Sequence, residues 1–231
     1  MIIKEGTGQM SKKMVDTATQ RSNIYGFLSL IYRTEITEPV LKHVREPDFL
    51  SVLSGMGAQL ENDFFNKLGD DLLEELAVEY TRLFIGPGKH ISPHESVHHK
   101  RDDGDWGQLW GKSTVEVRKF IEASGLEYTP EYRGMPDHIS VELEFMQQAA
   151  KMESQALEDN DNEGLLYCLK MEKRFIEEHL LKWVPGFCDR IISDAEMSFY
   201  REMARVTKHF MEFEEEEIKR YISDAETGSF I

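Results

Sequence analysis

Apolar residues recur at intervals of three and four along almost the whole chain, a spacing that places them on one face of a helix. The pattern predicts a long first helix over residues 11–33, and shorter helices that begin at Pro39, at Pro47, near Leu60 and at Asp70. Further helices are predicted over residues 109–123, 164–184, 187–192 and 195–222, with one more that begins at Asp137. No segment alternates as a strand does, so we expect an all-α fold, an irregular bundle of about nine or ten helices.

Glycine and proline residues interrupt this periodicity most clearly at residues 125–136, which contain two of each and show no helical period. Such a stretch predicts a break between helices. We therefore expect a single all-α domain with an N-terminal lobe (1–124), a hinge (125–136) and a C-terminal lobe (137–231).

Residues 79–99 contain the other strong interruption. The sequence Gly-Pro-Gly at 86–88 cannot continue the preceding helix, so we expect a loop there. Ser92, Pro93 and Glu95 then have the order of a capping box, with serine at the N-cap and glutamate three residues later. The pattern predicts that a helix stops, a loop follows and a short helix begins within a few residues.

The chain of 231 residues is 40% apolar, which is enough for a sizeable hydrophobic core. It carries 27 Lys and Arg against 43 Asp and Glu, a net charge of −16. A field of that sign repels nucleic acid and anionic lipid and favours basic partners. Part of the charge lies in the run EFEEEEIKR, which we expect to be a solvated helix face that includes Glu214.

The N-terminus lacks the apolar stretch of a signal peptide, and the longest apolar run, residues 24–32, is too short to cross a membrane. Cys168 and Cys188 have no metal-binding spacing, and we expect them to be buried thiols in a reducing compartment. These features predict a cytoplasmic protein that has no stable membrane insertion and binds no nucleic acid.

Residues 94–98 spell HExxH, the pattern that places two histidines on one helical face with a glutamate beside them to activate zinc-bound water. His94, Glu95 and His98 therefore define an alternative function, a zinc metallopeptidase, for which Glu116 is available as a third ligand. Against it, the motif occupies the first turn after Pro93, whereas zinc binding needs a rigid helix. Di-iron chemistry would need two Glu-x-x-His pairs, and the sequence has only one.

The segment Met135-Pro136-Asp137-His138 precedes a strongly periodic stretch. Pro136 favours extended geometry at Met135, and Asp137 then stands where an N-cap or first-turn carboxylate belongs. An ordinary helix start explains these residues. The functional alternative is that Asp137 and His138, at the mouth of the hinge, hold a group of a ligand, and the residues alone leave both interpretations open.

Three segments occur in an order and spacing that identify a family. The first is E-Y-T-R-L-F-I-G-P-G at 79–88, followed by P-x-E-S-V at 93–97. The second is P-D-H-x-x-x-E-L-E-F-M at 136–146, and a weaker third is F-x-x-x-H-L-x-x-W-x-P-x-F at 175–187. Together they resemble the TorD/DmsD/NarJ-type chaperones, the redox enzyme maturation proteins that assist molybdenum-containing oxidoreductases.

This resemblance implies a chaperone rather than an enzyme, and we expect no catalytic residue, metal or cofactor. Its partners would be the twin-arginine signal peptide and the apo catalytic subunit of a molybdoenzyme, which it would hold back from export until cofactor insertion. The chaperone itself would be a monomer or a homodimer. The peptide-binding residues that the resemblance implies are Tyr80, Leu83, Phe84, Pro87, Pro93, Glu95, Ser96, Asp137 and His138. The chain departs from the family at His94 and His98, where aromatic residues are usual.

A twin-arginine peptide combines two fixed cations with an apolar segment. Excess acid near a loop that exposes Ile85 and Ile91 suits such a ligand. Exposed ion pairs contribute only about 0.2–1 kcal/mol each, so charge would select the peptide while apolar burial, at about 25 cal/mol per Å², supplies most of the affinity. We therefore expect an anionic, partly apolar cleft in which the segment after Phe84 faces Asp137.

Overall fold

The computed structural model describes residues 4–100, 108–129 and 131–227, with side chains from residue 12 onwards. Every regular element in these ranges is a helix, η1 and η2 being single π-helical turns. In chain order they are α1 (Lys4–Arg33), α2 (Glu38–Val44), α3 (Pro47–Gly55), α4 (Asn62–Phe65), α5 (Gly69–Tyr80), η1 (Thr81–Ile85), α6 (Glu95–His98), α7 (Lys112–Ala123), α8 (Ile139–Glu158), α9 (Asn162–Phe175), η2 (Ile176–Leu180), α10 (Leu181–Asp194) and α11 (Ser198–Thr227). The predicted all-α bundle is confirmed. No helix in the described ranges combines the length and the apolar character that a membrane span needs.

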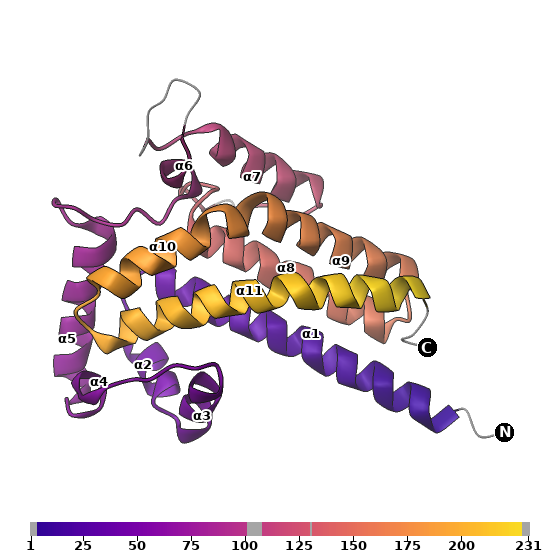
Figure 1. Ribbon diagram of the computed structural model, residues 1–231, viewed down its shortest axis with the longest axis horizontal. Coiled ribbons are helices and arrows are strands. Elements are labelled where there is room, and N and C mark those ends of the chain that lie inside the picture. Colours follow the sequence, from indigo (N-terminus) through magenta and orange to yellow (C-terminus); the bar gives the residue numbers. More distant parts are fainter. Residues whose placement is uncertain (1–3, 101–107, 130, 228–231) are drawn as a thin grey trace.

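Figure 1 shows an elongated bundle in which the long helices α1 and α11 run beside α8 and α9. The short helices α2 to α5 lie at one end of it, and α6 and α7 lie on the side away from α1. α1 packs most extensively against α8, although the predicted hinge separates these two helices in sequence. The division into two lobes stays a prediction, and the helices on both sides of the hinge contribute to one core.

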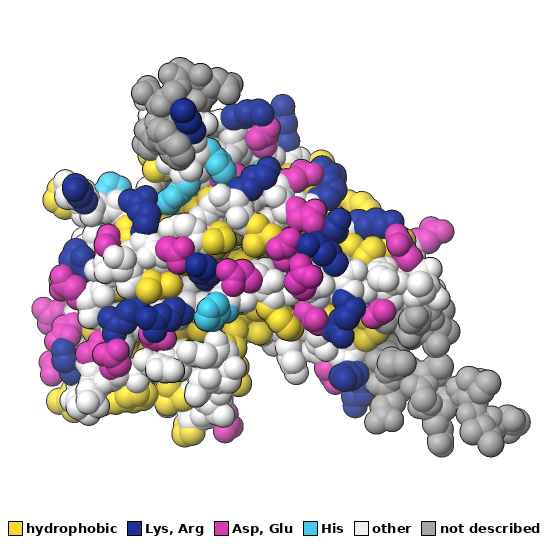
Figure 2. Space-filling view, in the orientation of Figure 1, with side chains coloured by type: hydrophobic (Ala, Val, Ile, Leu, Met, Phe, Trp, Pro, Cys, Tyr) yellow, Lys and Arg dark blue, Asp and Glu magenta, His cyan; other side chains and the backbone are white. Residues whose placement is uncertain are grey.

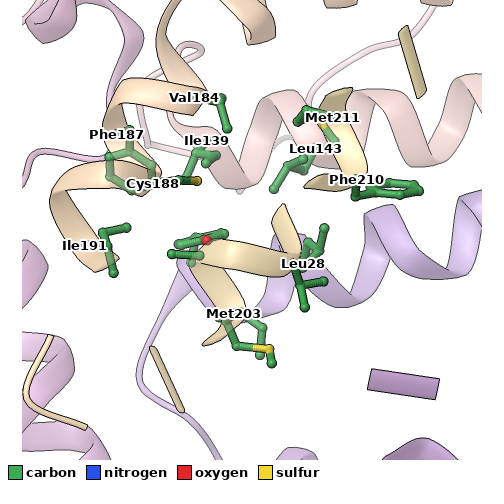
Figure 3. Packing of buried hydrophobic residues seen from close by; sticks show 14 of the residues in the cluster. Leu28, Ile139, Leu143, Val184, Phe187, Cys188, Ile191, Met203, Phe210 and Met211 are labelled. Carbon is green, nitrogen blue, oxygen red and sulfur yellow. The ribbon is translucent and has the colours of Figure 1, made fainter. Parts of the chain in front are cut away.

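The main hydrophobic core lies where α1, α8, α10 and α11 meet (Figure 3). Leu28 of α1, Leu143 of α8, Phe187 of α10 and Met203 of α11 are fully buried there. Because apolar residues spaced by three and four share one side of a helix, each helix presents a continuous apolar face to this core. The two cysteines, Cys168 and Cys188, are buried free thiols, as predicted.

Helix α10 continues through Pro185, so the predicted helix end before this residue is wrong. Proline lacks the N–H that would bond to the carbonyl of Leu181. The π-helical turn η2 directly precedes this helix, and the neighbouring side chains of Trp183 and Phe187 are buried. Burial of this apolar face therefore keeps the segment helical despite the missing hydrogen bond.

The acidic run near the C-terminus is not a uniformly solvated face. Glu215 pairs with Lys219 at 2.8 Å near the surface, but Glu214 is fully buried and accepts hydrogen bonds from Arg21 Nε at 2.8 and 3.0 Å. The predicted exposure of Glu214 is wrong because a cation on α1, 193 residues away in sequence, meets it inside the bundle.

Candidate functional site

The loop before α6 and the start of α8 lie side by side, so the first two sequence motifs meet in space. His94 and His138 form an isolated antiparallel bridge, in which Glu95 N donates to the Asp137 carbonyl and Ile139 N donates to the Pro93 carbonyl, both at 2.9 Å. The rings of His94 and His138 are in edge contact, 4.9 Å between centroids. We call this meeting point, residues 93–96 with residues 137–139, the motif junction.

Asp137 is fully buried at the motif junction, and its role differs from the predicted cap of its own helix. Its Oδ2 accepts a hydrogen bond from Ser96 N at 2.9 Å, so the carboxylate stabilises the start of α6. The N-cap of α8 is His138, whose Nδ1 accepts from Ser140 N at 3.1 Å. Burial lowers the pKa of His138 to about 3, which keeps its ring neutral and Nδ1 available as an acceptor.

Glu95 is buried, and its side chain turns inward, so the predicted capping box is wrong. Helix α6 begins at Glu95 itself, and the carboxylate accepts from His99 Nε2 at 2.9 Å and from His179 Nδ1 at 3.0 Å. Burial alone would favour the neutral acid, but the hydrogen bonds from His179 and His99 outweigh it and lower the pKa of Glu95. Glu95 thus ties α6 to η2 as an ionised carboxylate.

Three residues that the sequence did not assign to the site, Glu142, His179 and Trp183, complete this buried polar group. Trp183 Nε1 donates to Glu142 Oε2 at 3.0 Å, and Glu142 is fully buried. Burial, reinforced by the negative charge of Glu95, raises the pKa of Glu142 well above its ordinary value. His179 and Trp183 stand one helical turn apart in the third motif, and that spacing was the available signal that both face the same side.

The HExxH residues do not have the arrangement of a zinc site. His94 is the N-cap of α6 with extended backbone, so it does not share a helical face with His98. His98 Nε2 lies 2.7 Å from the carbonyl of Ser92, and its ring packs on Trp183. Glu116 pairs with Lys112 on α7. Within the described ranges, no three His, Cys, Asp or Glu side chains gather as metal ligands.

Most of the predicted site residues in the first motif belong to the hydrophobic core and do not form an exposed binding surface. Tyr80, Leu83 and Phe84 are buried, and Phe84 contacts the rings of Tyr32, Tyr80, Phe187 and Tyr200. Pro87 is exposed on the loop that follows and is not part of the motif junction. The structure thus brings five predicted site residues together and leaves the other four in the core or on the loop; the five are Pro93, Glu95, Ser96, Asp137 and His138.

The loop itself is held at its base by a hydrogen bond of 2.7 Å from Ile91 N to the carbonyl of Leu83. This bond directs Ile91 into the core, so the predicted exposure of Ile91 is wrong, whereas Ile85 is exposed as predicted. The loop therefore offers less apolar surface than the sequence indicated.

A cavity of about 410 Å³ lies beside the motif junction, between the end of α7, the predicted hinge and the first turns of α8. We call it the hinge pocket. Tyr128 and Tyr132 line it with stacked rings 5.7 Å apart, and the Tyr132 hydroxyl donates to the Met135 carbonyl at 2.8 Å. Its other lining residues are Arg33, Ile121, Leu126, Glu127, Thr129, Val141, Glu144, Phe145 and Gln148. The pocket is therefore apolar and aromatic inside, with two carboxylates and one arginine, and Arg33 is already paired with Glu144 at 2.6 Å.

A larger groove runs along α7 and reaches the motif junction, where Glu95 and Ser96 line it. It consists of two adjoining cavities of about 660 and 530 Å³ that share Glu116, Glu178 and Lys182. Six cations line them, Lys100, Lys112, Lys119, Lys170, Arg174 and Lys182, against three glutamates. Over α7 and α9, Figure 2 shows Lys and Arg side chains among the acidic ones. The predicted anionic cleft is therefore wrong for this groove. The hinge pocket has one more carboxylate than cations, but neither the segment after Phe84 nor Asp137 lines it, so it is not the predicted cleft either.

Comparisons with known proteins cover the three motif-bearing segments. The family model described as nitrate reductase delta subunit matches residues 47–189. The chain is 25% identical over 204 residues to the chaperone protein TorD of Vibrio cholerae, covering 84% of this chain and 89% of that protein. It is 27% identical over 192 residues to the TorD of Photobacterium profundum, covering 78% and 86%.

Among solved structures, a proposed redox enzyme maturation protein from Archaeoglobus fulgidus is 24% identical, with 83% of this chain and 93% of that chain covered and a TM-score of 0.47. The family match spans more than half of this chain and includes the motif junction and every lining residue of the hinge pocket except Arg33. The chain therefore belongs to the nitrate reductase delta subunit family, which confirms its resemblance to the TorD/DmsD/NarJ-type chaperones.

Proposed function

We propose that this protein is a cytoplasmic chaperone for the maturation of a molybdenum-containing oxidoreductase. It binds the twin-arginine signal peptide of the catalytic subunit and assists cofactor insertion, folding and export control, without catalysing a reaction. Family membership and the similarity to proteins named TorD support this proposal. The observation that carries it is the antiparallel meeting of residues 93–96 with residues 137–139, which joins both family motifs; the second motif then continues into the hinge pocket at Val141, Glu144 and Phe145.

The hinge pocket is the place that suits the peptide best. Leu126, Tyr128 and Tyr132 are partly exposed and offer apolar surface to the apolar segment, and burial at about 25 cal/mol per Å² supplies most of the affinity. Glu127 is exposed and can meet one arginine, and Glu144 can meet the other by exchanging its ion pair with Arg33; each such pair adds about 0.2–1 kcal/mol. The carboxylates therefore select for the double cation while the aromatic and aliphatic walls hold the chain.

The buried carboxylates of the motif junction influence peptide binding indirectly, without being its main contacts. Asp137 and Glu95 have hardly any surface, so they cannot be principal contacts of a large ligand. Asp137 holds the start of α6, and Glu95 holds α6 against η2. Both are positioning residues in this account, since they fix the backbone of the two segments that meet next to the hinge pocket.

Calorimetric titration with three synthetic peptides tests the proposal. We expect the twin-arginine peptide to bind most tightly and its Lys-Lys variant more weakly, because ammonium groups lack the bidentate fork of guanidinium. A variant whose apolar residues are replaced by serine should bind most weakly. Glu127→Gln should narrow the difference between the Arg-Arg and Lys-Lys peptides, whereas Glu163→Gln, an exposed glutamate on α9, should leave it unchanged. Equal affinity for all three peptides would refute the proposed specificity.

A further inference from the structure

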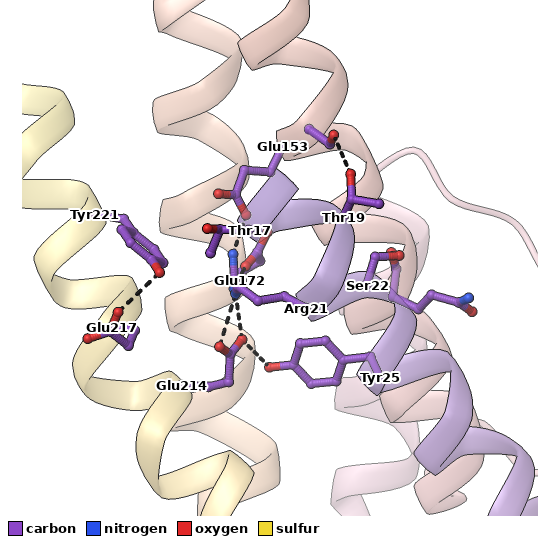
Figure 4. Close-up of polar contacts among 12 residues, drawn as sticks. Thr17, Thr19, Arg21, Ser22, Tyr25, Glu153, Glu172, Glu214, Glu217 and Tyr221 are labelled. Carbon is purple, nitrogen blue, oxygen red and sulfur yellow. Dashed lines mark hydrogen bonds and ion pairs between the residues drawn. The ribbon is translucent and has the colours of Figure 1, made fainter. Parts of the chain in front are cut away.

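A buried ion cluster joins α1 to three other helices, at a distance from the proposed peptide site (Figure 4). The guanidinium of Arg21 on α1 forms ion pairs with Glu153 on α8, Glu172 on α9 and Glu214 on α11. The Nε–Oε2 distance to Glu214 is 2.8 Å. All four side chains are at least nine-tenths buried. One arginine therefore provides the central polar contact among four packed helices.

The charges of this cluster do not balance. Three ionised carboxylates against one guanidinium would leave a net charge of −2 out of contact with water, and an uncompensated buried charge costs several kcal/mol. Bringing the charge to zero requires protons on two of the carboxyl groups, and a single proton already halves the excess. The folded protein thus has a physical reason to bind protons here that the unfolded chain, whose carboxyl groups are hydrated, does not share.

The other titratable and charged groups around the cluster do not supply the missing positive charge. On α1, the Tyr25 hydroxyl donates to Glu214 Oε2 at 3.0 Å, and it stays neutral because burial raises its pKa. On α9, burial likewise raises the pKa of the Cys168 thiol to about 12. On α11, the ring of Tyr221 lies 5.6 Å from the Arg21 guanidinium, and its hydroxyl donates to Glu217.

The remaining charges on α11 pair with each other. Arg220 forms an ion pair with Glu217 at the edge of the cluster, so these two charges cancel locally. Among the described contacts of Arg21, Glu153 is the only titratable group that comes from α8. No described neighbour therefore offsets the excess of carboxylates.

Glu153 and Glu172 are the pair best placed to hold a proton. Their carboxyl groups bind the two terminal nitrogens of the guanidinium, Nη1 and Nη2, whereas Glu214 is satisfied by Nε and by the Tyr25 hydroxyl. Oε1 of Glu172 is buried and has no donor among the described residues. Burial raises the pKa of both groups, and the charge of Glu214 adds to the effect on each, although Arg21 opposes it.

We propose that the folded protein keeps a proton on the Glu153–Glu172 pair at neutral pH, and that its loss at alkaline pH releases α1 from α8, α9 and α11. The cluster is thus a pH-sensitive clamp. A carboxyl whose pKa is raised by folding contributes stability that is complete below its ordinary range and is lost as the pH rises through the folded value. Release of α1 would uncover the apolar faces that α1 and α8 now bury against each other.

Denaturant unfolding between about pH 6 and about pH 9 tests this clamp. Glu142 also carries a raised pKa, so Glu142→Gln serves as the reference protein. The lowered pKa values of His94, His98 and His138 and the raised ones of Cys168 and Cys188 affect the reference and its variants alike, so the cluster proton is measured as the difference between them. Compared with the same protein carrying Glu153→Gln, we expect the unfolding equilibrium constant of the reference to rise more steeply with pH, by up to about tenfold per unit, the slope of one proton. Adding Glu153→Gln should flatten the slope; if that variant fails to fold, Glu172→Gln replaces it.

Two further readouts separate a proton site from a merely structural contact. Difference infrared spectra of the reference at neutral pH should contain the carbonyl stretch of a protonated carboxyl, and Glu153→Gln should remove or shift it. Hydrogen exchange should show protection factors in α1 that fall with rising pH while those in α10 stay constant. A reference protein without the carboxyl band, or with equal pH dependence in α1 and α10, would overturn the proposal.

Discussion

Arg21→Ala is expected to lower the free energy of unfolding by about 3–5 kcal/mol at neutral pH, which is a large part of the stability of an ordinary domain. The substitution removes the only described cation from a buried site that retains Glu153, Glu172 and Glu214. Because these carboxyl groups can take up protons, the loss should be smaller at acidic pH and larger at alkaline pH. Denaturant unfolding of both proteins across this pH range measures the effect.

Arg33→Ala is the matched control for this prediction, since Arg33 lies on the same helix and also pairs with a glutamate. Its side chain is 42% exposed and that of Glu144 is 46% exposed, so water screens the pair. We therefore expect Arg33→Ala to lower the free energy of unfolding by only about 0.2–1 kcal/mol. Similar losses for Arg21→Ala and Arg33→Ala would show that the buried cluster does not contribute to stability in the way inferred here.

Asp137→Ala is expected to weaken binding of the twin-arginine peptide by about tenfold or more while the protein stays folded. The substitution leaves the buried N–H of Ser96 without its acceptor, which costs about 1–3 kcal/mol, while the two backbone hydrogen bonds of the motif junction remain. The start of α6 is then held less firmly against the segment that leads into the hinge pocket at Val141. Calorimetry gives the affinity, and thermal unfolding reports the stability of the same samples.

Asp161→Ala provides the comparison, because Asp161 is an ordinary capping aspartate that accepts from Gly164 N at 3.0 Å at the start of α9. Loss of this cap should cost about 1 kcal/mol of stability and leave peptide binding unchanged. If Asp137→Ala also bound the peptide like the unsubstituted protein, Asp137 would be a structural residue without influence on the site.

Local sequence patterns were sufficient to predict most of the helices and to identify the two segments that form the motif junction. Spacings of three and four gave α7 and the start of α8 to within three residues, because an apolar face is a property of neighbouring residues, but they placed the start of α1 seven residues too late and the end of α11 five residues too early. The same reasoning failed at Pro185, where burial of Trp183 and Phe187 outweighs a missing backbone hydrogen bond. A purely local rule contains no information about such packing.

The roles of the polar residues could not be read locally, since their partners are distant in sequence. Asp137 meets a backbone N–H 41 residues away, and Glu95 meets His179 across 84 residues. Both carboxylates fitted ordinary helix caps at the sequence level, and only the tertiary fold shows that they stabilise other elements. Glu214 belonged to an acidic run whose other glutamates lie at or near the surface, and nothing in that run indicated its pairing with Arg21.

The distribution of charge was the other property that composition could not supply. A net charge of −16 indicated an acidic cleft, yet the α7 groove is lined by six cations and three glutamates. The smaller hinge pocket combines apolar walls with Glu127 and Glu144. Net charge describes the whole surface, whereas binding depends on the few groups that line one cavity.

Photo-cross-linking tests most directly whether the hinge pocket is the peptide site. A twin-arginine peptide that carries a benzophenone side chain in its apolar segment is bound to the full chain, irradiated and mapped by mass spectrometry. We predict adducts on residues that line the hinge pocket, foremost Leu126, Tyr128, Tyr132 and Val141. Adducts confined to the α7 groove, at Tyr167 or Met171 for example, or no adduct at all, would contradict the account.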